Sequence, residues 1–287
     1  MIAIYKKELL SYFTHMMGYV FLAFMLLVVG IGFAVGNLAG LNANFQNALS
    51  SAIIAFFILI PVLTMRLFSE EARQKTDQLI FTSPLSIFSI VAGKFFAAFT
   101  LFFIATAITG VLPIILNRFG TVPVSHVVGT YIGFLLIGAA CIAVGVFISV
   151  LTDNQIIAAV ITIGAILGMF ILDVVVMLMP TTTLASFIFV AMIIAAVVTI
   201  WFNATRNIIA TVALAAIALA IAGGLYLHNN LIYDGIIVRV LVWFSIFGRF
   251  GNFSRGILNI RDIVYYLSFC GLFLYFTVNV IERRRWR

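Results

Sequence analysis

The chain has 287 residues, of which 64% are hydrophobic and 9% are charged. Soluble globular proteins have roughly 45–50% apolar and 25% charged residues, so this chain has too few polar groups to cover a water-facing surface. The composition therefore indicates a lipid bilayer as solvent. The net charge of +7 does not indicate nucleic-acid binding, because the basic clusters border apolar runs, a pattern that reflects membrane topology.

A short segment at the N-terminus, residues 1–16, carries apolar side chains on one helical face and Lys6 and Lys7 on the wet face. This pattern is typical of an interfacial helix that lies flat on the membrane. An apolar run long enough to span the membrane follows this charged N-terminal segment, and no A-x-A-like cleavage site lies after it. The N-terminal region is therefore expected to be a retained signal anchor.

The apolar runs that follow are long enough to cross about 30 Å of hydrocarbon as helices. There are eight, at 17–36, 50–68, 94–116, 127–151, 156–179, 182–202, 208–227 and 263–281. Their unbroken apolar character excludes the alternating polarity of barrel strands. The sequence predicts an all-α, polytopic transmembrane helix bundle of about eight spans, although the pair 182–202 and 208–227, joined by a short turn, is also compatible with a re-entrant hairpin. Glycine pairs at four-residue spacing predict close helix approaches, at Gly32/Gly36, Gly129/Gly133 and Gly164/Gly168.

Basic residues set the predicted orientation. With both termini in the cytoplasm, eleven Lys and Arg residues lie on the cytoplasmic side and five on the other, as the positive-inside rule requires. We therefore expect a multi-pass protein of the inner (cytoplasmic) membrane with both termini cytoplasmic. The two longest connections are 69–93, on the cytoplasmic side, and 228–262, outside. The second contains an apolar stretch interrupted by Arg239 and Arg249, which predicts an outer re-entrant or surface segment.

The sequence lacks three common motifs of nucleotide-binding and hydrolytic sites. It contains no Walker-type phosphate loop, no H-E-x-x-H and no G-x-S-x-G. His15, His126 and His228 fall near the ends of predicted spans, and Cys141 and Cys270 lie inside apolar runs, which favours interfacial and packing roles over a metal site or a disulfide. We expect neither an enzyme nor a cofactor or metal bound by this chain.

Charge is most concentrated in residues 69–86, where five charged residues occur within eight positions. Ser69 is suited to cap a helix whose first turn carries Glu70 and Glu71, and Pro84 would end that helix after an apolar triplet. This pattern predicts a short amphipathic cytoplasmic helix suited to docking on another protein. A solvated loop held at the lipid headgroups is the alternative that the pattern leaves open.

The stretch Ser69-Glu-Glu-Ala-Arg-Gln-Lys-Thr-Asp-Gln-Leu79, followed by Thr82-Ser-Pro84 and Gly93-Lys94, resembles the E-E-[RK]-x-x-G-T-x-[ED]-x-L-x-x-[ST]-P…G-K segment of ABC-type-2 exporter permeases. The C-terminal part, Arg255–Ser268 with Glu282-Arg-Arg-Arg-Trp286, looks like the gliding-motility-type branch of that family. Lys75 departs from the pattern, which often has Gly before Thr. Most members have six spans, so residues 182–227 are expected to be an extra hairpin.

The resemblance implies that residues 1–287 form one transmembrane permease domain and that 69–93 contains the coupling helix for a separate ATPase. The implied ATPase-coupling residues are Glu70, Glu71, Arg73, Thr76, Asp77 and Leu79. The implied partners are ABC ATPase subunits, which bind ATP and Mg, a second permease of the same or a different chain, and an auxiliary membrane subunit. The implied function is ATP-driven export by alternating access.

Asp173 is a separate candidate, because it lies inside the apolar run 156–179. A carboxylate within a membrane is costly and usually faces a cavity or a partner, which makes Asp173 a candidate for the transport pathway. Its position about two turns from Pro180 leaves an interfacial role open. An ATP-independent channel or proton-coupled transporter that uses Asp173 is the competing function, and a membrane scaffold of a larger assembly is the third.

Overall fold

The computed structural model describes residues 1–287 apart from 43, 77–84, 119, 121, 229–232 and 286–287. Within the described residues all regular structure is helical and no strand occurs, which confirms the all-α prediction. The chain divides into two compact units, Met1–Met169 with Ile246–Arg287, and Phe170–Ser245. We call them unit 1 and unit 2 and describe each by itself.

Seven helices of the described part are long and apolar enough to cross a membrane. They are Met16–Ala39, Gln46–Gln74, Ile87–Leu116, Val124–Leu151, Gln155–Leu178, Thr183–Asn203 and Ile260–Arg284. The eighth predicted run, 208–227, is also helical, with a shorter apolar stretch at Thr211–Tyr226. The protein is therefore a polytopic membrane protein, as its composition predicts.

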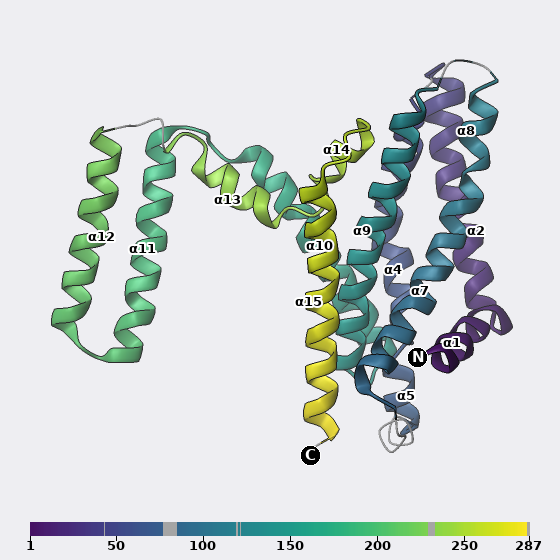
Figure 1. The fold of residues 1–287 in the computed structure, drawn as a ribbon, viewed down its shortest axis with the longest axis horizontal. Helices are drawn as coiled ribbons and strands as arrows, with labels where there is room; N and C mark the ends of the chain where they lie inside the picture. The colour runs from purple at the N-terminus through teal and green to yellow at the C-terminus, as the bar shows by residue number, and fades with distance from the viewer. Residues whose placement is uncertain (43, 77–84, 119, 121, 229–232, 286–287) are drawn as a thin grey trace. The chain divides into compact units, whose positions relative to one another are not determined.

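Unit 1 contains most of these helices (Figure 1). In chain order they are α1 (Ile2–Thr14), α2 (Met16–Phe33) with a π-helical end (Ala34–Ala39), α3 (Gln46–Ala52), a 3₁₀ turn (Ile53–Ala55), α4 (Phe56–Thr64), α5 (Ser69–Gln74), α7 (Ile87–Thr109), α8 (Val111–Leu116), α9 (Val124–Leu151), the first part of α10 (Gln155–Leu178), α14 (Phe250–Ser254) and α15 (Ile260–Arg285). Helix α9 is central, since it packs against α4, α7, α14 and α15.

The three glycine pairs differ in what they contact. A Cβ atom on Gly133 would lie 2.5 Å from the Cβ of Phe253, so α14 is seated directly on α9 there. A Cβ atom on Gly32 would lie 2.1 Å from Ser51 Oγ, so α2 and α3 also approach closely. Both results confirm the expected close packing. Gly164 has no atom of the described residues within 4 Å of such a Cβ, so for that pair a close helix approach stays a prediction.

The third predicted span begins earlier than residue 94. Helix α7 starts at Ile87, after Ser86, whose hydroxyl accepts a hydrogen bond from the Ser89 amide at 3.3 Å. Serine is a favoured N-cap because it satisfies an amide that has no partner within the helix. Residues 87–93 are therefore the first turns of α7 rather than part of the connection, and Lys94 lies inside the helix.

Unit 2 contains the end of α10, α11 (Thr183–Thr205), α12 (Ile208–His228) and α13 (Ile236–Phe244). Helices α11 and α12 form a hairpin, and Arg206 turns the chain between them in the left-handed conformation, with φ of 53°. Helix α13 has nine residues and is about 14 Å long, too short to cross a bilayer. Whether residues 228–262 lie on the surface or re-enter the membrane stays a prediction.

Candidate coupling site

Helix α5 carries three of the predicted coupling residues, Glu70, Glu71 and Arg73, and Thr76 follows it. Asp77 and Leu79 lie outside the described residues. Both glutamates lie in the first turn of the helix, where carboxylates interact favourably with the helix dipole.

The ends of α5 differ from the prediction. Phe68 is the N-cap and contributes no side-chain bond, while Ser69 is the first helical residue and its hydroxyl donates to the Met65 carbonyl. The prediction that Ser69 caps the helix is therefore wrong. At the other end Lys75 adopts the left-handed conformation, with φ of 57°, and the helix stops at Gln74. A residue in the left-handed conformation at the end of a helix is usually Gly. This preference gives a physical reason for the Gly that the resembled pattern often has at the position of Lys75.

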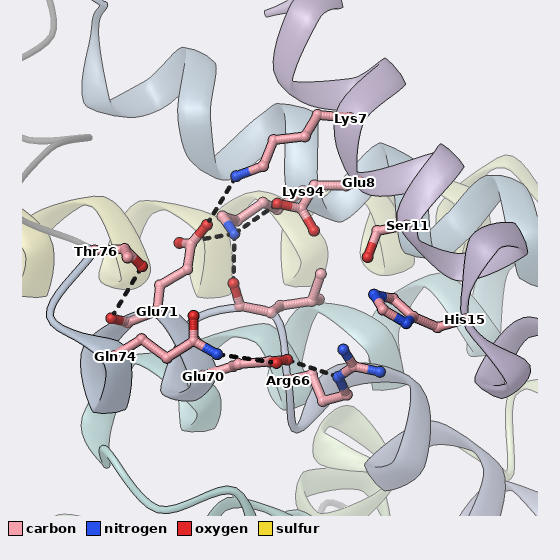
Figure 2. Close-up of a pocket in the computed structure, with 11 residues that line it drawn as sticks. Lys7, Glu8, Ser11, His15, Arg66, Glu70, Glu71, Gln74, Thr76 and Lys94 are labelled. Carbon is pink, nitrogen blue, oxygen red and sulfur yellow. Dashed lines mark hydrogen bonds and ion pairs between the residues drawn. The ribbon is translucent and has the colours of Figure 1, made fainter.

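Lys94 is the centre of the charged cluster that surrounds α5 (Figure 2). Its side chain is 1% exposed, and its Nζ lies 3.0 Å from Glu8 Oε1 and 2.9 Å from Glu71 Oε2. It also donates to the Leu67 carbonyl at 2.5 Å and lies 4.9 Å from the centre of the Phe68 ring. An ammonium group has three donors, and these three oxygens match them. A buried charge is tolerated when it is paired and hydrogen-bonded in this way, so Lys94 joins α7 to α1 and α5.

Gly93 makes this arrangement possible. A Cβ atom at this position would lie 3.2 Å from both Met1 O and Ile4 Cγ2 of α1. That distance is already tight for a methyl-sized group, so glycine lets α1 pass close over α7. The Tyr5 hydroxyl and the Thr100 hydroxyl, 3.1 Å apart, continue the same contact along the two helices. The Gly-Lys pair of the sequence thus serves the docking of α1.

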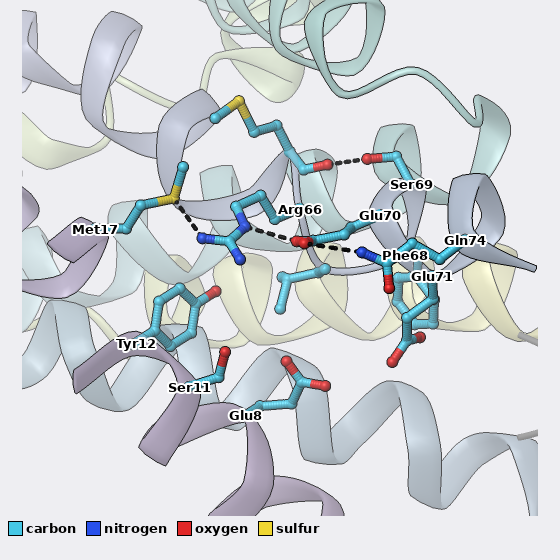
Figure 3. A network of polar contacts seen from close by, with 12 residues as sticks. Glu8, Ser11, Tyr12, Met17, Arg66, Phe68, Ser69, Glu70, Glu71 and Gln74 are labelled. Atoms are coloured by element: carbon cyan, nitrogen blue, oxygen red, sulfur yellow. Dashed lines mark hydrogen bonds and ion pairs between the residues drawn. The ribbon is translucent and has the colours of Figure 1, made fainter. Parts of the chain in front are cut away.

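A second set of polar contacts joins α1 to the end of α4, and α2 to the turn before α5 (Figure 3). Arg66 Nε donates to Glu70 at 2.7 Å, and Arg66 Nη1 contacts the sulfur of Met17 at 3.0 Å. The Tyr12 hydroxyl donates to the Leu63 carbonyl at 2.9 Å. Burial raises the pKa of Tyr12 far above its ordinary value, so the hydroxyl stays protonated and available as a donor.

Ser149 of α9 fixes the turn between α4 and α5. Its hydroxyl oxygen accepts from the amides of Phe68 and Ser69 at 3.1 and 3.3 Å, and its proton is directed to the Met65 carbonyl at 3.3 Å. These backbone groups have no partner within a helix, because the chain changes direction here. Helix α5 is consequently held at its start by α9 and along its side by Lys94.

The structure separates the predicted coupling residues into two groups. Glu70 and Glu71 are paired within the protein, and the Thr76 hydroxyl lies 3.4 Å from the Glu71 carbonyl, whereas Arg73 is exposed. Lys75, which was not among the predicted coupling residues, is exposed beside it. Asp173 belongs to unit 2, where its carboxylate accepts a hydrogen bond from the Ser245 hydroxyl at the end of α13.

Sequence reasoning missed Glu8, Arg66 and Lys94 as members of the site. Lys94 carried a usable signal, since a lysine that follows directly on an apolar run requires a carboxylate partner. The identity of that partner was not readable, because the membrane-spanning segments Met16–Ala39 and Gln46–Gln74 separate Glu8 from Lys94 in the sequence.

The model of a protein family described as ABC-2 family transporter protein matches residues 37–227, more than half of the chain. The chain belongs to the ABC-2 transporter family. It is a membrane permease of an ABC transporter, and the matched region includes α5 and Lys94 of the permease but not Glu8. No curated protein and no solved structure matches the chain.

Proposed function

We propose that the permease is the transmembrane subunit of an ATP-driven exporter and that α5 is its contact with a separate ATPase subunit. ATP and Mg are bound by that subunit and not by this chain. The observation that carries the proposal is the exposed basic end of α5, Arg73 and Lys75, on a helix whose other side is fixed by Glu71 to the buried Lys94. A stiff, charged projection of this kind suits a contact that has to transmit movement.

The surroundings of α5 support an orientation with this end in the cytoplasm. Arg284 lies 3.6 Å from Asp153 of the α9–α10 turn, and Val150 and Ile281 share a buried cluster with Ile87. The N-terminus, α5 and the C-terminus are thus at the same end of unit 1 (Figure 1). This end carries Lys6, Lys7, Arg66, Arg73, Lys75, Lys94, Arg283 and Arg284. The positive-inside rule supports a cytoplasmic location for this end, and we therefore propose a permease of the inner membrane with both termini cytoplasmic.

The proposed mechanism uses Lys94 as the shared contact. A displacement of α5 by the ATPase moves Glu71, and Lys94 passes the force to α7 and, through Glu8, to α1. Nucleotide binding shifts the permease between inward- and outward-open states only if the ATPase contacts the two states differently. A second permease completes the transporter, with an auxiliary membrane subunit in the gliding-motility-type branch that the C-terminal part resembles.

The test reverses the exposed charges and leaves the internal pairs intact. The double variant Arg73→Glu with Lys75→Glu should insert normally, because neither side chain is part of the Lys94 contacts. Reversed charges at an interface cost several kcal/mol, so we expect loss of the ATPase subunit from pull-downs of the native membrane. Substrate-dependent ATP turnover should fall with it.

Arg118→Glu is the matched control, since Arg118 is an exposed arginine beyond the end of α8, away from α5. It should retain the ATPase. Full retention by the double variant would place the contact elsewhere on the permease. If no ATPase copurifies with the wild-type protein, and the purified permease moves substrate alone, the ATP-independent channel or proton-coupled transporter replaces the exporter. Loss of that transport in Asp173→Asn would assign it to the carboxylate.

A further inference from the structure

A cavity of about 420 Å³ lies between α1, the α4–α5 segment and α7. One end of this cavity contains the Lys94 contacts described above. The other end is formed by Ser11, His15 and Arg66, which Figure 2 shows close together on the side away from Thr76. These three residues have no part in the contacts of Lys94.

Each of the three offers a hydrogen-bond donor that no described residue of the protein accepts. Arg66 uses Nε for Glu70 and Nη1 for Met17, while its Nη2, the Ser11 hydroxyl and the His15 ring form no hydrogen bond with the part of the chain that the structure describes. Three neighbouring donors, one of them the Nη2 of a guanidinium group, suit the oxygens of a phosphate group.

The charges of the cavity limit which phosphate fits. Its three carboxylates, Glu8, Glu70 and Glu71, are balanced by Lys7, Lys94 and Arg66. The cavity is therefore nearly neutral overall, and each negative charge on a ligand adds to the repulsion from the three carboxylates, so a ligand with one charge meets less repulsion than a ligand with two. A phosphodiester with one negative charge fits better than inorganic phosphate, which carries more than one at neutral pH.

The place of His15 in the chain indicates where such a diester comes from. His15 is the single residue between α1 and the membrane-spanning helix α2, and it is exposed. Large apolar side chains are exposed on both sides of His15, with Leu10 63% exposed on α1 and Met16 79% exposed on α2. The joint between an amphipathic helix and a membrane-spanning helix is expected at the headgroup level of a bilayer.

We propose that Ser11, His15 and Arg66 bind the phosphate of a membrane phospholipid, with its acyl chains along the exposed face of α2. The bound phosphate links the α1–α2 joint to Arg66 and so to the turn that precedes α5. The proposal is independent of the ATPase contact, because it uses none of the exposed basic residues of α5.

The test measures thermal unfolding of the purified full-length permease in detergent with three probes. They are dioleoylphosphatidylglycerol, dioleoylglycerol, which has the same chains without phosphate, and inorganic phosphate. We expect the phosphatidylglycerol to raise Tm and the other two to leave it nearly unchanged. His15→Ala and Arg66→Lys should each weaken the apparent affinity for phosphatidylglycerol about tenfold, since each loses a hydrogen bond to a charged group, and Arg66→Lys keeps the charge opposite Glu70.

Thr14→Ala is the matched control, because Thr14 is exposed beside His15 and its hydroxyl bonds to the Leu10 carbonyl of its own helix. It should bind phosphatidylglycerol like the wild type. Equal stabilisation by dioleoylglycerol would overturn the phosphate site, and so would wild-type affinity in both His15→Ala and Arg66→Lys. Equal stabilisation by inorganic phosphate, lost in the same variants, would replace the lipid by a free phosphate.

Discussion

Two cations with little exposure, Lys94 and Arg249, stand near the two ends of unit 1 and are used differently. Lys94 contacts Glu8 and Glu71, which come from two other helices. Arg249, with 12% of its side chain exposed, pairs with Asp262 at 2.8 Å and lies 3.9 Å from the centre of the Tyr265 ring. The first cation joins three segments that are distant in the sequence, while the second pairs with residues that follow it closely.

In the proposed mechanism the Lys94 contacts transmit movement between helices, whereas the Arg249 contacts fix a local turn. Asn252 also donates to Asp262, at 3.0 Å, so these contacts hold the short helix α14 against the start of α15. If one contact of this turn is removed, the other contacts of Arg249 and Asp262 still hold α14 in place. Removal of Lys94 deletes the ionic link from α7 to Glu8 of α1 and to Glu71 of α5, and it leaves these two carboxylates without their shared cation.

The largest expected effect is therefore that of Lys94→Met. Breaking a buried ion pair by removing one partner typically costs about 3–5 kcal/mol. Here Glu8 and Glu71 both lose the contact with Lys94, and Glu71 retains only the exposed Lys7 at 3.6 Å. We expect a fall of that size in the free energy of unfolding, measured in mixed micelles. The exposed Lys6 provides the control, and Lys6→Met should change stability by less than about 0.5 kcal/mol.

A further variant separates charge from packing. Lys94→Met combined with Glu8→Gln and Glu71→Gln removes the cation and both carboxylates, so it should recover part of the lost stability. Recovery would show that uncompensated charge causes the loss. If the triple variant is no more stable than Lys94→Met, the lysine stabilises the helices by its shape and its bond to Leu67, and the comparison with Arg249 no longer holds.

Asp262→Asn should have a smaller effect. The amide still accepts a hydrogen bond from Arg249, and the guanidinium keeps its place over the Tyr265 ring. We expect a loss of about 1–3 kcal/mol, the usual cost of weakening a charged hydrogen bond at a buried site. The neighbouring Arg261 is exposed, so Arg261→Gln is the control and should be nearly neutral. A loss as large as that of Lys94→Met would mean that the outer turn is as tightly coupled as the α5 end.

Much of the fold was predictable from the sequence because lipid leaves the backbone few choices. Every unbroken apolar run became a helix, since an amide in hydrocarbon has no other partner. The start of α7 was predicted seven residues late, because the polar Ser86 and Ser89 that begin it were read as part of the connection. Lys94 was consequently placed at a helix end in water instead of inside a packed helix.

The candidate site was only partly predictable, because charge density does not tell which way a side chain points. Glu70 and Glu71 were predicted for the partner, and the structure turns both toward cations of the same chain. Arg73 faces solvent as a docking residue must. The deciding residue, Glu8, lies on a separate helix that reaches Lys94 by tertiary packing, and a single sequence carries no signal for that approach.

The smallest expected effect concerns the end of α5, which both the docking proposal and the Lys94 contacts depend on. Lys75 holds a left-handed backbone conformation, with φ of 57°, which is unfavourable for a residue with a Cβ atom. Lys75→Gly should relieve this strain and raise the free energy of unfolding by about 0.5–1 kcal/mol, less the entropy that glycine adds to the unfolded chain. Gln74→Gly, one residue earlier in helical conformation, should instead lower it by up to about 1 kcal/mol. Equal losses in both variants would show that α5 continues through Lys75 and that the helix end described here does not form.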